Sequence, residues 1–248
     1  MTGNTPPTLL LLHGATCNGR MWDALKRGLD PKFRVITPDL PGHGARRAEL
    51  FTLQGAIDTV VACAASLEGS PLILGGDSLG GYSTLAAAAS LPPQQLKGLI
   101  LCGSSSNLTG AALLPYRLQV AIFKTMLALK GEDKLIASMR PKLIRDIGME
   151  PADVDAMIGA KMSLRVFSQC VNALRDLDFR SKLAAVEVPV MIVNGTKDSG
   201  HMRQEASFLA VAKDGTVEHL ENCRHGVTIR RSADCARLFN RFAARIFA

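Results

Sequence analysis

Short apolar runs, each bounded by Gly, Pro or Asp, recur along the chain with enough sequence between them for a helix. Such runs are typical of strands that are buried on both faces, as the strands of a parallel sheet are. The intervening segments show the pattern of helices. Strand and helix therefore alternate, which predicts an α/β fold with a doubly wound sheet and helices on both of its faces. We expect strands at residues 8–12, 33–37, 72–74, 99–102, 190–193 and 217–220, and helices at 21–29, 53–67, 80–91, 203–212 and 232–247.

The alternation is interrupted once, between residues 107 and 182, where no strand pattern occurs. This segment predicts helices only, at residues 113–129, 133–147, 151–162 and 164–174. In an open α/β sheet, a helical insertion normally lies over the carboxyl ends of the strands, where ligands bind. We therefore expect a core formed by residues 1–106 and 183–248, and a helical cap, or lid, formed by residues 107–182.

The predicted cap carries apolar side chains that are open to two interpretations. Leu113, Phe123, Met126 and Phe167 could line an apolar substrate pocket above the sheet. Alternatively, each of them only packs inside the cap, since flexible Met side chains and aromatic rings commonly fill such gaps.

The segment Gly76-Asp77-Ser78-Leu79-Gly80 matches the pattern G-x-S-x-G and lies between a predicted strand and a predicted helix. In this pattern the serine occupies a sharp, strained turn, where a Cβ atom at either glycine would collide with a neighbouring strand or helix. The turn would hold the Ser78 hydroxyl at the carboxyl edge of the sheet, above the positive end of a helix. The pattern therefore predicts a serine nucleophile.

A serine nucleophile needs a general base, and that base needs a group that fixes its tautomer and stabilises its cation. His225 lies in a polar loop after the last predicted strand, so its loop would open at the same edge of the sheet as Ser78. It is the expected base. His201 is the nearest rival, and its closeness to Asp198 in the sequence leaves the local hydrogen bonding open.

Asp198 follows the strand at 190–193 by a short turn, so it is the expected orienting acid. Asp176 and Asp178, at the end of the cap, are the alternatives. Acyl transfer also needs donors for the oxyanion that forms on the substrate carbonyl, and backbone amides can supply them. By position, these would be the N–H groups of Leu79, just after the nucleophile, and of Ala15, in the turn after the first strand.

Taken together, these motifs resemble the α/β-hydrolase superfamily, in the capped branch that contains small-molecule esterases, cofactor-free haloperoxidase-like enzymes and carbon–carbon bond hydrolases. The resemblance covers nearly the whole chain and rests on LLLLHGA, ITPDLPGHG, GGDSLGG, NGTKD and CRHG, in that order. It implies a triad of Ser78, Asp198 and His225, with an oxyanion hole at Ala15 and Leu79. Only about seven residues precede the first predicted strand, so we expect no opening β-hairpin of the family's kind and a wholly parallel sheet of about six strands.

The resemblance implies a serine hydrolase that cleaves a small or medium carboxylic ester, thioester or lactone through an acyl-enzyme. Two alternatives stay open: a carbon–carbon bond hydrolase with the same triad, and a non-catalytic ligand-binding protein on the same scaffold. Asp77 departs from the family pattern, in which His or Gln often precedes the nucleophile. A carboxylate there could disturb the pair of Ser78 and His225 or form a hydrogen bond within the loop, and we expect the second.

Composition and hydropathy narrow the partners and the location that can be expected of this protein. Aromatic residues make up only 5% and are not interleaved with the basic ones, so the net charge of +7 does not predict nucleic acid as a partner. The uninterrupted apolar runs are shorter than the ~20 residues of a bilayer span, and no basic segment precedes the first of them. We therefore expect a cytoplasmic protein without stable membrane insertion, whose partner is a small acyl substrate. The sequence does not predict an oligomeric state.

Metal and cofactor chemistry have no signature in this sequence. No cluster of potential metal ligands and no glycine loop of the phosphate-binding kind occurs, so we expect neither a metal nor an organic cofactor. Six cysteines occur without a C-x-x-C pair and are expected to be reduced thiols.

Overall fold

A single parallel sheet organises the computed structural model, which describes residues 6–247 of the chain. Its six strands follow the order β2-β1-β3-β4-β5-β6, and every neighbouring pair is parallel. This confirms the predicted α/β fold with a wholly parallel sheet of six strands. The strands are β1 (Thr8–Leu12), β2 (Arg34–Ile36), β3 (Leu72–Asp77), β4 (Leu96–Cys102), β5 (Val190–Gly195) and β6 (Gly215–Leu220).

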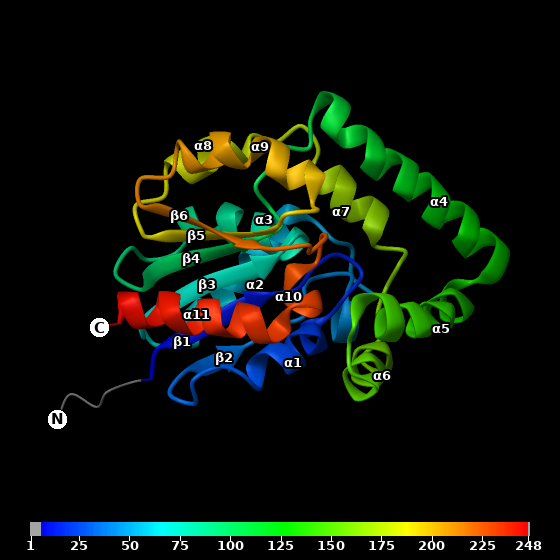
Figure 1. The fold of residues 1–248 in the computed structure, drawn as a ribbon, viewed down its shortest axis with the longest axis horizontal. Helices are drawn as coiled ribbons and strands as arrows, with labels where there is room; N and C mark the ends of the chain where they lie inside the picture. Colours follow the sequence, from blue (N-terminus) through cyan, green and yellow to red (C-terminus); the bar gives the residue numbers. More distant parts are fainter. Residues whose placement is uncertain (1–5, 248) are drawn as a thin grey trace.

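Helices cover both faces of the sheet, which is why every residue of β1 and β3 is buried. On one face, α1 packs against α11, and the ring of Trp22, just before α1, lies against that of Phe239. On the other, α2, α3 and α8 lie side by side, with the rings of Tyr82 and Phe179 in contact (Figure 1). The helices of this part are α1 (Asp23–Lys26), α2 (Leu53–Ala65), α3 (Leu79–Ala87), α8 (Phe179–Ala184), α9 (Ser199–Leu209), α10 (Val227–Arg230) and α11 (Ser232–Ile246).

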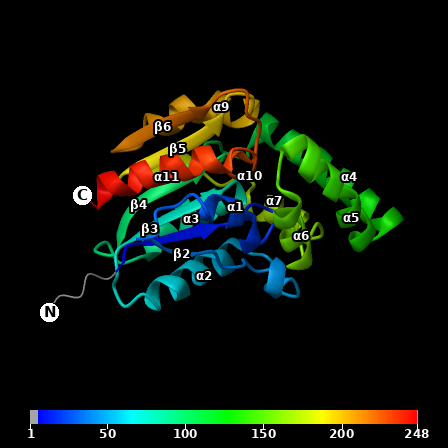
Figure 2. The same cartoon turned by 60° about the horizontal axis from the view of Figure 1, so that its bottom comes forward.

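Between β4 and β5 the chain forms helices and no strand within the described residues, as the sequence predicts. Helices α4, α5 and α6 lie together at one end of the sheet, and the C-terminal end of α11 lies at the other (Figure 2). We refer to residues 107–182 as the cap segment, and its limits stay a prediction. Its helices are α4 (Leu114–Lys130), α5 (Glu132–Lys142), α6 (Pro151–Gly159) and α7 (Phe167–Leu174), and the limit at residue 182 falls within α8.

Several predicted elements differ in their bounds from the observed ones, and two of these differences have a clear physical reason. The helix expected at 133–147 changes to a π-helical turn at Leu143–Ile147, just after Pro141 in the last turn of α5. Proline lacks an N–H group and crowds the preceding turn, which widens or breaks a helix. Strand β3 runs three residues further than predicted, because Gly75 and Gly76 continue the pairing with β4.

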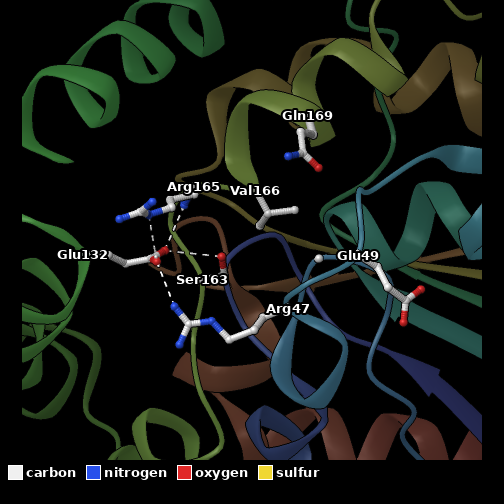
Figure 3. A pocket seen from close by; sticks show the side chains of 8 residues that line it. Arg47, Glu49, Glu132, Ser163, Arg165, Val166 and Gln169 are labelled. Atoms are coloured by element: carbon white, nitrogen blue, oxygen red, sulfur yellow. Dashed lines mark hydrogen bonds and ion pairs between the residues drawn. The ribbon is translucent and has the colours of Figure 1, made fainter. Parts of the chain in front are cut away.

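A buried carboxylate fastens the cap segment to the core (Figure 3). Glu132, at the start of α5, accepts hydrogen bonds from the backbone amides of Leu164 at 2.7 Å and Arg165 at 3.1 Å, and from the Ser163 hydroxyl at 3.3 Å. It also pairs with the guanidinium groups of Arg165 at 3.2 Å and Arg47 at 3.0 Å. Arg47 belongs to the core, so this one side chain joins α5, the loop before α7 and the loop after β2.

We expect Glu132→Ala to lower the free energy of unfolding by about 3 kcal/mol, because two buried amides lose their acceptor and two arginines lose their partner. For a chain of this size, that corresponds to a fall of roughly 6–12 °C in Tm. Thermal unfolding followed by circular dichroism measures it. Glu132→Gln is the matched control: it keeps one acceptor oxygen and should lose roughly half as much. A Tm for Glu132→Ala equal to that of the native chain would contradict the assignment.

Candidate active site

Ser78 lies on a strained turn between β3 and α3, at the carboxyl edge of the sheet. Its backbone has φ = 53° and ψ = −114°, a conformation that residues other than Gly rarely adopt. Two backbone hydrogen bonds hold it there: the Ser78 amide donates to the Cys102 carbonyl at 2.8 Å, and the Tyr82 amide donates to the Ser78 carbonyl at 3.1 Å. The turn therefore places Ser78 just before α3, at the carboxyl ends of the strands.

Glycines make this turn possible because three chain segments meet there. A Cβ atom on Gly76 would clash with the backbone of Gly80, and one on Gly80 would clash with the backbone at the end of β1. The steric reason given for the G-x-S-x-G pattern is therefore confirmed. Gly103, at the end of β4, has a similar role that the sequence analysis did not identify. It has φ = 55°, and a Cβ atom there would lie 3.1 Å from the His225 ring.

Ser78, His225 and Asp198 form a continuous chain of hydrogen bonds. His225 Nε2 lies 2.9 Å from Ser78 Oγ, and His225 Nδ1 lies 2.7 Å from Asp198 Oδ2. The three residues come from the ends of β3, β5 and β6, whose carboxyl ends meet at one edge because the strands are parallel. The structure thus brings together the three residues predicted from widely separated parts of the sequence.

Asp198 and His225 have pKa values that are shifted in opposite directions. Burial raises the pKa of Asp198, but hydrogen bonds from His201 and His225 outweigh burial and hold that pKa well below its usual value. Desolvation lowers the pKa of His225, whereas the hydrogen bond and charge of Asp198 raise it, and the net pKa lies above the ordinary 6.5. Asp198 is therefore ionised, so His225 donates from Nδ1 and leaves Nε2 free to accept the Ser78 proton.

Two backbone amides close to the Ser78 turn have no hydrogen-bond partner among the described residues. Within residues 6–247, neither the N–H of Leu79 nor that of Ala15 donates a hydrogen bond to a protein group. Leu79 begins α3, so its amide belongs to the positive end of that helix. The two predicted oxyanion donors are thus both free to bind an anionic oxygen.

The comparison with protein families agrees with this geometry. A family model described as the alpha/beta hydrolase family matches residues 9–238, which is nearly the whole chain. The chain belongs to the α/β-hydrolase family. Among curated proteins, it is similar to the pimeloyl-(acyl-carrier protein) methyl ester esterase of Aromatoleum aromaticum. The two are 28% identical over 245 residues, which cover 93% of this chain and 95% of the relative.

Solved structures show the same α/β-hydrolase fold at low sequence identity. MenH from S. aureus has a TM-score of 0.80 at 17% identity, and the match covers 100% of this chain and 97% of the other. A thermophilic esterase from Thermogutta terrifontis has a TM-score of 0.78 at 19% identity, with 98% and 92% covered. Because identity is this low, these two likenesses establish the fold and nothing finer.

In this α/β-hydrolase, a second histidine binds the same oxygen of Asp198. His201 Nδ1 lies 2.9 Å from Asp198 Oδ2, and its ring is stacked on that of His225 with centroids 5.0 Å apart. Its Nε2 lies 3.2 Å from the Tyr82 hydroxyl, which in turn lies 2.9 Å from Ser106 Oγ. Burial lowers the pKa of His201 more than Asp198 raises it, so His201 is neutral at pH 7. The rival base of the sequence analysis thus lies behind the acid, away from Ser78 Oγ.

Asp77 leaves the hydrogen bond between Ser78 and His225 intact, although its charge helps to raise the pKa of His225. Its buried Oδ1 accepts a hydrogen bond of 2.9 Å from Thr228 Oγ1, in α10 just after His225. The expected bond within the loop is wrong in its partner, since the acceptor reaches across to a segment 151 residues away in the sequence. Burial raises the pKa of Asp77, against the opposing effects of His225 and Thr228.

The cavity beside His225 differs from the predicted pocket. Its volume is about 520 Å³, within the range of small-molecule sites, and it lies between the start of α4 and the start of α9. None of Leu113, Phe123, Met126 and Phe167 lines it. Phe123 and Phe167 pack edge to face with centroids 5.1 Å apart, and Leu113 is buried in the core. The lining residues are Ser106, Ala111, Ala112, Pro115, Tyr116, Gln119, Asp198, Ser199, Gly200, Arg203, Gln204 and His225.

One group of side chains has the composition of a metal site. Potential ligand atoms of Asp198, His201 and His225 lie within 4.8 Å of one another. Both imidazoles, however, direct Nδ1 at a single carboxylate oxygen, at 2.7 and 2.9 Å. These are hydrogen-bond distances between the would-be ligands themselves, which accounts for the cluster without an ion.

Proposed function

We propose that this α/β-hydrolase is a serine hydrolase that cleaves carboxylic esters, thioesters or lactones of small or medium size. The hydrogen-bonded chain from Ser78 through His225 to Asp198 carries the proposal, since it is the arrangement that acyl transfer requires. The esterase named among its relatives supports the same class of reaction.

In the proposed mechanism, Ser78 Oγ attacks the carbonyl carbon while His225 Nε2 takes the hydroxyl proton. The oxyanion binds the amides of Leu79 and Ala15, and Asp198 stabilises the imidazolium. His225 then gives the proton to the departing alcohol or thiol, which leaves an acyl group on Ser78. Water attacks that acyl group, His225 takes a proton from the water, and the acid departs as the proton returns to Ser78 Oγ.

The cavity beside His225 supports the substrate size. A volume of about 520 Å³ suits a molecule of modest size, and its lining is mainly of small and polar residues. Arg203 lines the same cavity and would pair with a carboxylate at the far end of an anionic substrate. Esters that carry a second, distal acid group are therefore the favoured members of the class.

Labelling with a fluorophosphonate, followed by mass spectrometry of the peptides, tests the proposal. We expect one adduct on Ser78 in the native chain and none in His225→Ala, because the hydroxyl then lacks its base. A native chain that stays unlabelled would favour the ligand-binding alternative. Labelling combined with turnover of a β-diketone, and no turnover of activated esters, would favour the carbon–carbon bond hydrolase.

The second histidine leads to a prediction about pH. His201 donates to the oxygen that His225 also uses, so it withdraws negative charge from His225. In His201→Phe, which keeps an aromatic ring against His225, the carboxylate acts on His225 alone and its pKa rises. The base works only when neutral, so the acidic limb of kcat/KM should move to higher pH. An unchanged limb would contradict this, and Tyr82→Phe is the control that leaves the bond between His201 and Asp198 in place.

A further inference from the structure

Helix α4 exposes most of the protein's large apolar side chains that face solvent. Six such side chains are exposed among residues 6–247, and four of them lie on α4: Leu114 at 59%, Leu118 at 64%, Ile122 at 47% and Leu129 at 78%. None of the 17 residues of α4 is fully buried, and the helix forms the outer rim of the cap segment (Figure 1). On a soluble chain, a group of this kind marks an interaction surface.

These four side chains form one stripe along the helix. Leu114, Leu118 and Ile122 follow at intervals of four residues, and Leu129 continues the stripe two turns later. At 1.5 Å per residue, the stripe is roughly 22 Å long. Its one polar member, Thr125, donates its hydroxyl to the Ala121 carbonyl at 3.0 Å. The stripe therefore offers an apolar face without free hydrogen-bond donors.

The charges of α4 have a single sign. Arg117, Lys124 and Lys130 are its charged residues, and it contains neither Asp nor Glu. Arg117 and Lys124 lie one heptad apart, along one border of the stripe. None of the three forms an ion pair in the described part of the chain. Three unpaired cations thus accompany the apolar face.

The segment Gly110–Lys130 is also, by length and composition alone, apolar enough to cross a membrane. Cations interrupt this segment, so it contains no continuous apolar run of spanning length. The inner side of α4 packs against α5 and α7, where Phe123 meets Phe167. The folded cap segment can therefore present only the outer face of α4 to another surface.

We propose that the outer face of α4 docks on an anionic lipid surface, with the helix lying in the plane of the interface. An apolar stripe bordered by Lys and Arg is what such surfaces bind, through buried apolar area and attraction to anionic headgroups. A second copy fits less well, because the two helices would bring their cations together without an acid to neutralise them. A protein partner fits less well too, since protein interfaces carry about one hydrogen bond per 100–200 Å² and this stripe supplies none.

The position of α4 connects this surface with the cavity beside His225. Ala112, Pro115, Tyr116 and Gln119 line that cavity and belong to α4 or to the turn just before it. A docked helix would place the cavity at the border of the lipid layer, so esters of lipid-like amphiphiles could enter from it. This step, unlike the docking, rests on the proposed function.

Co-sedimentation of the whole chain with vesicles tests the docking. The vesicles contain phosphatidylcholine, with or without phosphatidylglycerol. We expect the native chain to bind the anionic vesicles and Leu118→Glu to lower the partition coefficient at least about tenfold. Arg117→Ala combined with Lys124→Ala should lower it by about tenfold or more. The matched control is Leu50→Glu. Leu50 is 75% exposed but lies outside the cap segment, so this variant should bind as the native chain does.

Ser78→Ala should also bind vesicles as the native chain does, so docking and hydrolysis can fail separately. The delivery step predicts that Leu118→Glu keeps the native rate on a water-soluble ester but loses about tenfold on an ester embedded in vesicles. The proposal is overturned if the native chain does not bind anionic vesicles, or if Leu118→Glu binds them as well as the native chain does. It is also overturned if light scattering shows a dimer that Leu118→Glu converts to a monomer, because a second copy would then cover α4.

Discussion

Replacing Ser78 by Ala should reduce kcat for ester hydrolysis by about 10⁶-fold, which is the typical loss when a serine nucleophile is removed. The variant keeps the two free amides and the cavity, so weak hydrolysis above the rate in water should persist. Initial rates on an activated ester give the ratio of the two kcat values, provided that the enzyme concentration is high enough to detect the remaining activity. The variant should fold normally, because within the described residues the only hydrogen bond of Ser78 Oγ is the exposed one with His225.

Ser104→Ala is the matched control for this experiment. Ser104 is buried near the same turn, next to Gly81, and its hydroxyl has no hydrogen-bond partner in the described residues. We expect its activity to stay within about twofold of the native value, since surface and unbonded groups contribute little. A Ser78→Ala variant that retains more than a small fraction of native activity would remove Ser78 as the nucleophile.

Asp198→Asn should cost about 10⁴-fold in kcat, because the amide no longer fixes the tautomer of His225 or stabilises its cation. The change also has a direction on the pH axis. The charge of Asp198 raises the pKa of His225, so its removal lowers that pKa and moves the acidic limb of kcat/KM to lower pH. Rates measured between pH 5 and 9, with the folded state checked by circular dichroism, separate this effect from unfolding.

Asp178→Asn distinguishes this acid from its rival in the sequence. Asp178 caps α8 and accepts a hydrogen bond from Asn107 at 2.8 Å, whereas the imidazole of His225 is hydrogen-bonded to Asp198 and Ser78. Its substitution should leave kcat within about twofold and change stability only slightly, because Asn also caps helices well. Equal losses in the two variants would contradict the assignment of Asp198.

Several features of the fold follow from local sequence signals alone. The apolar runs predict the sheet because a strand buried on both faces has no polar side to display, and all six strands were found this way. The positions of Ser78, Asp198 and His225 follow from the same argument, since each lies just beyond a strand and parallel strands end at one edge. A rule about strands therefore gives the neighbourhood of side chains more than a hundred residues apart.

Contacts that depend on how two surfaces meet could not be predicted in this way. The sequence does not show whether His201 turns toward Ser78 or toward Asp198, because that depends on the first turn of α9. Similarly, the partner of Asp77 depends on where α10 lies against the strained turn that carries Ser78. The cavity lining was missed because bulky side chains such as Phe123 pack against each other, and small or polar residues are left to border the open space.

The hydrogen bond between Asp77 and Thr228 joins the two segments that carry Ser78 and His225, and neither belongs to the cap segment. The distance between the Ser78 hydroxyl and the His225 imidazole is thereby set inside the core. The cap segment can change its length, its helices or its contacts with a surface and leave the reacting atoms in register. In an α/β-hydrolase built this way, the choice of substrate and the chemical step can evolve as separate traits.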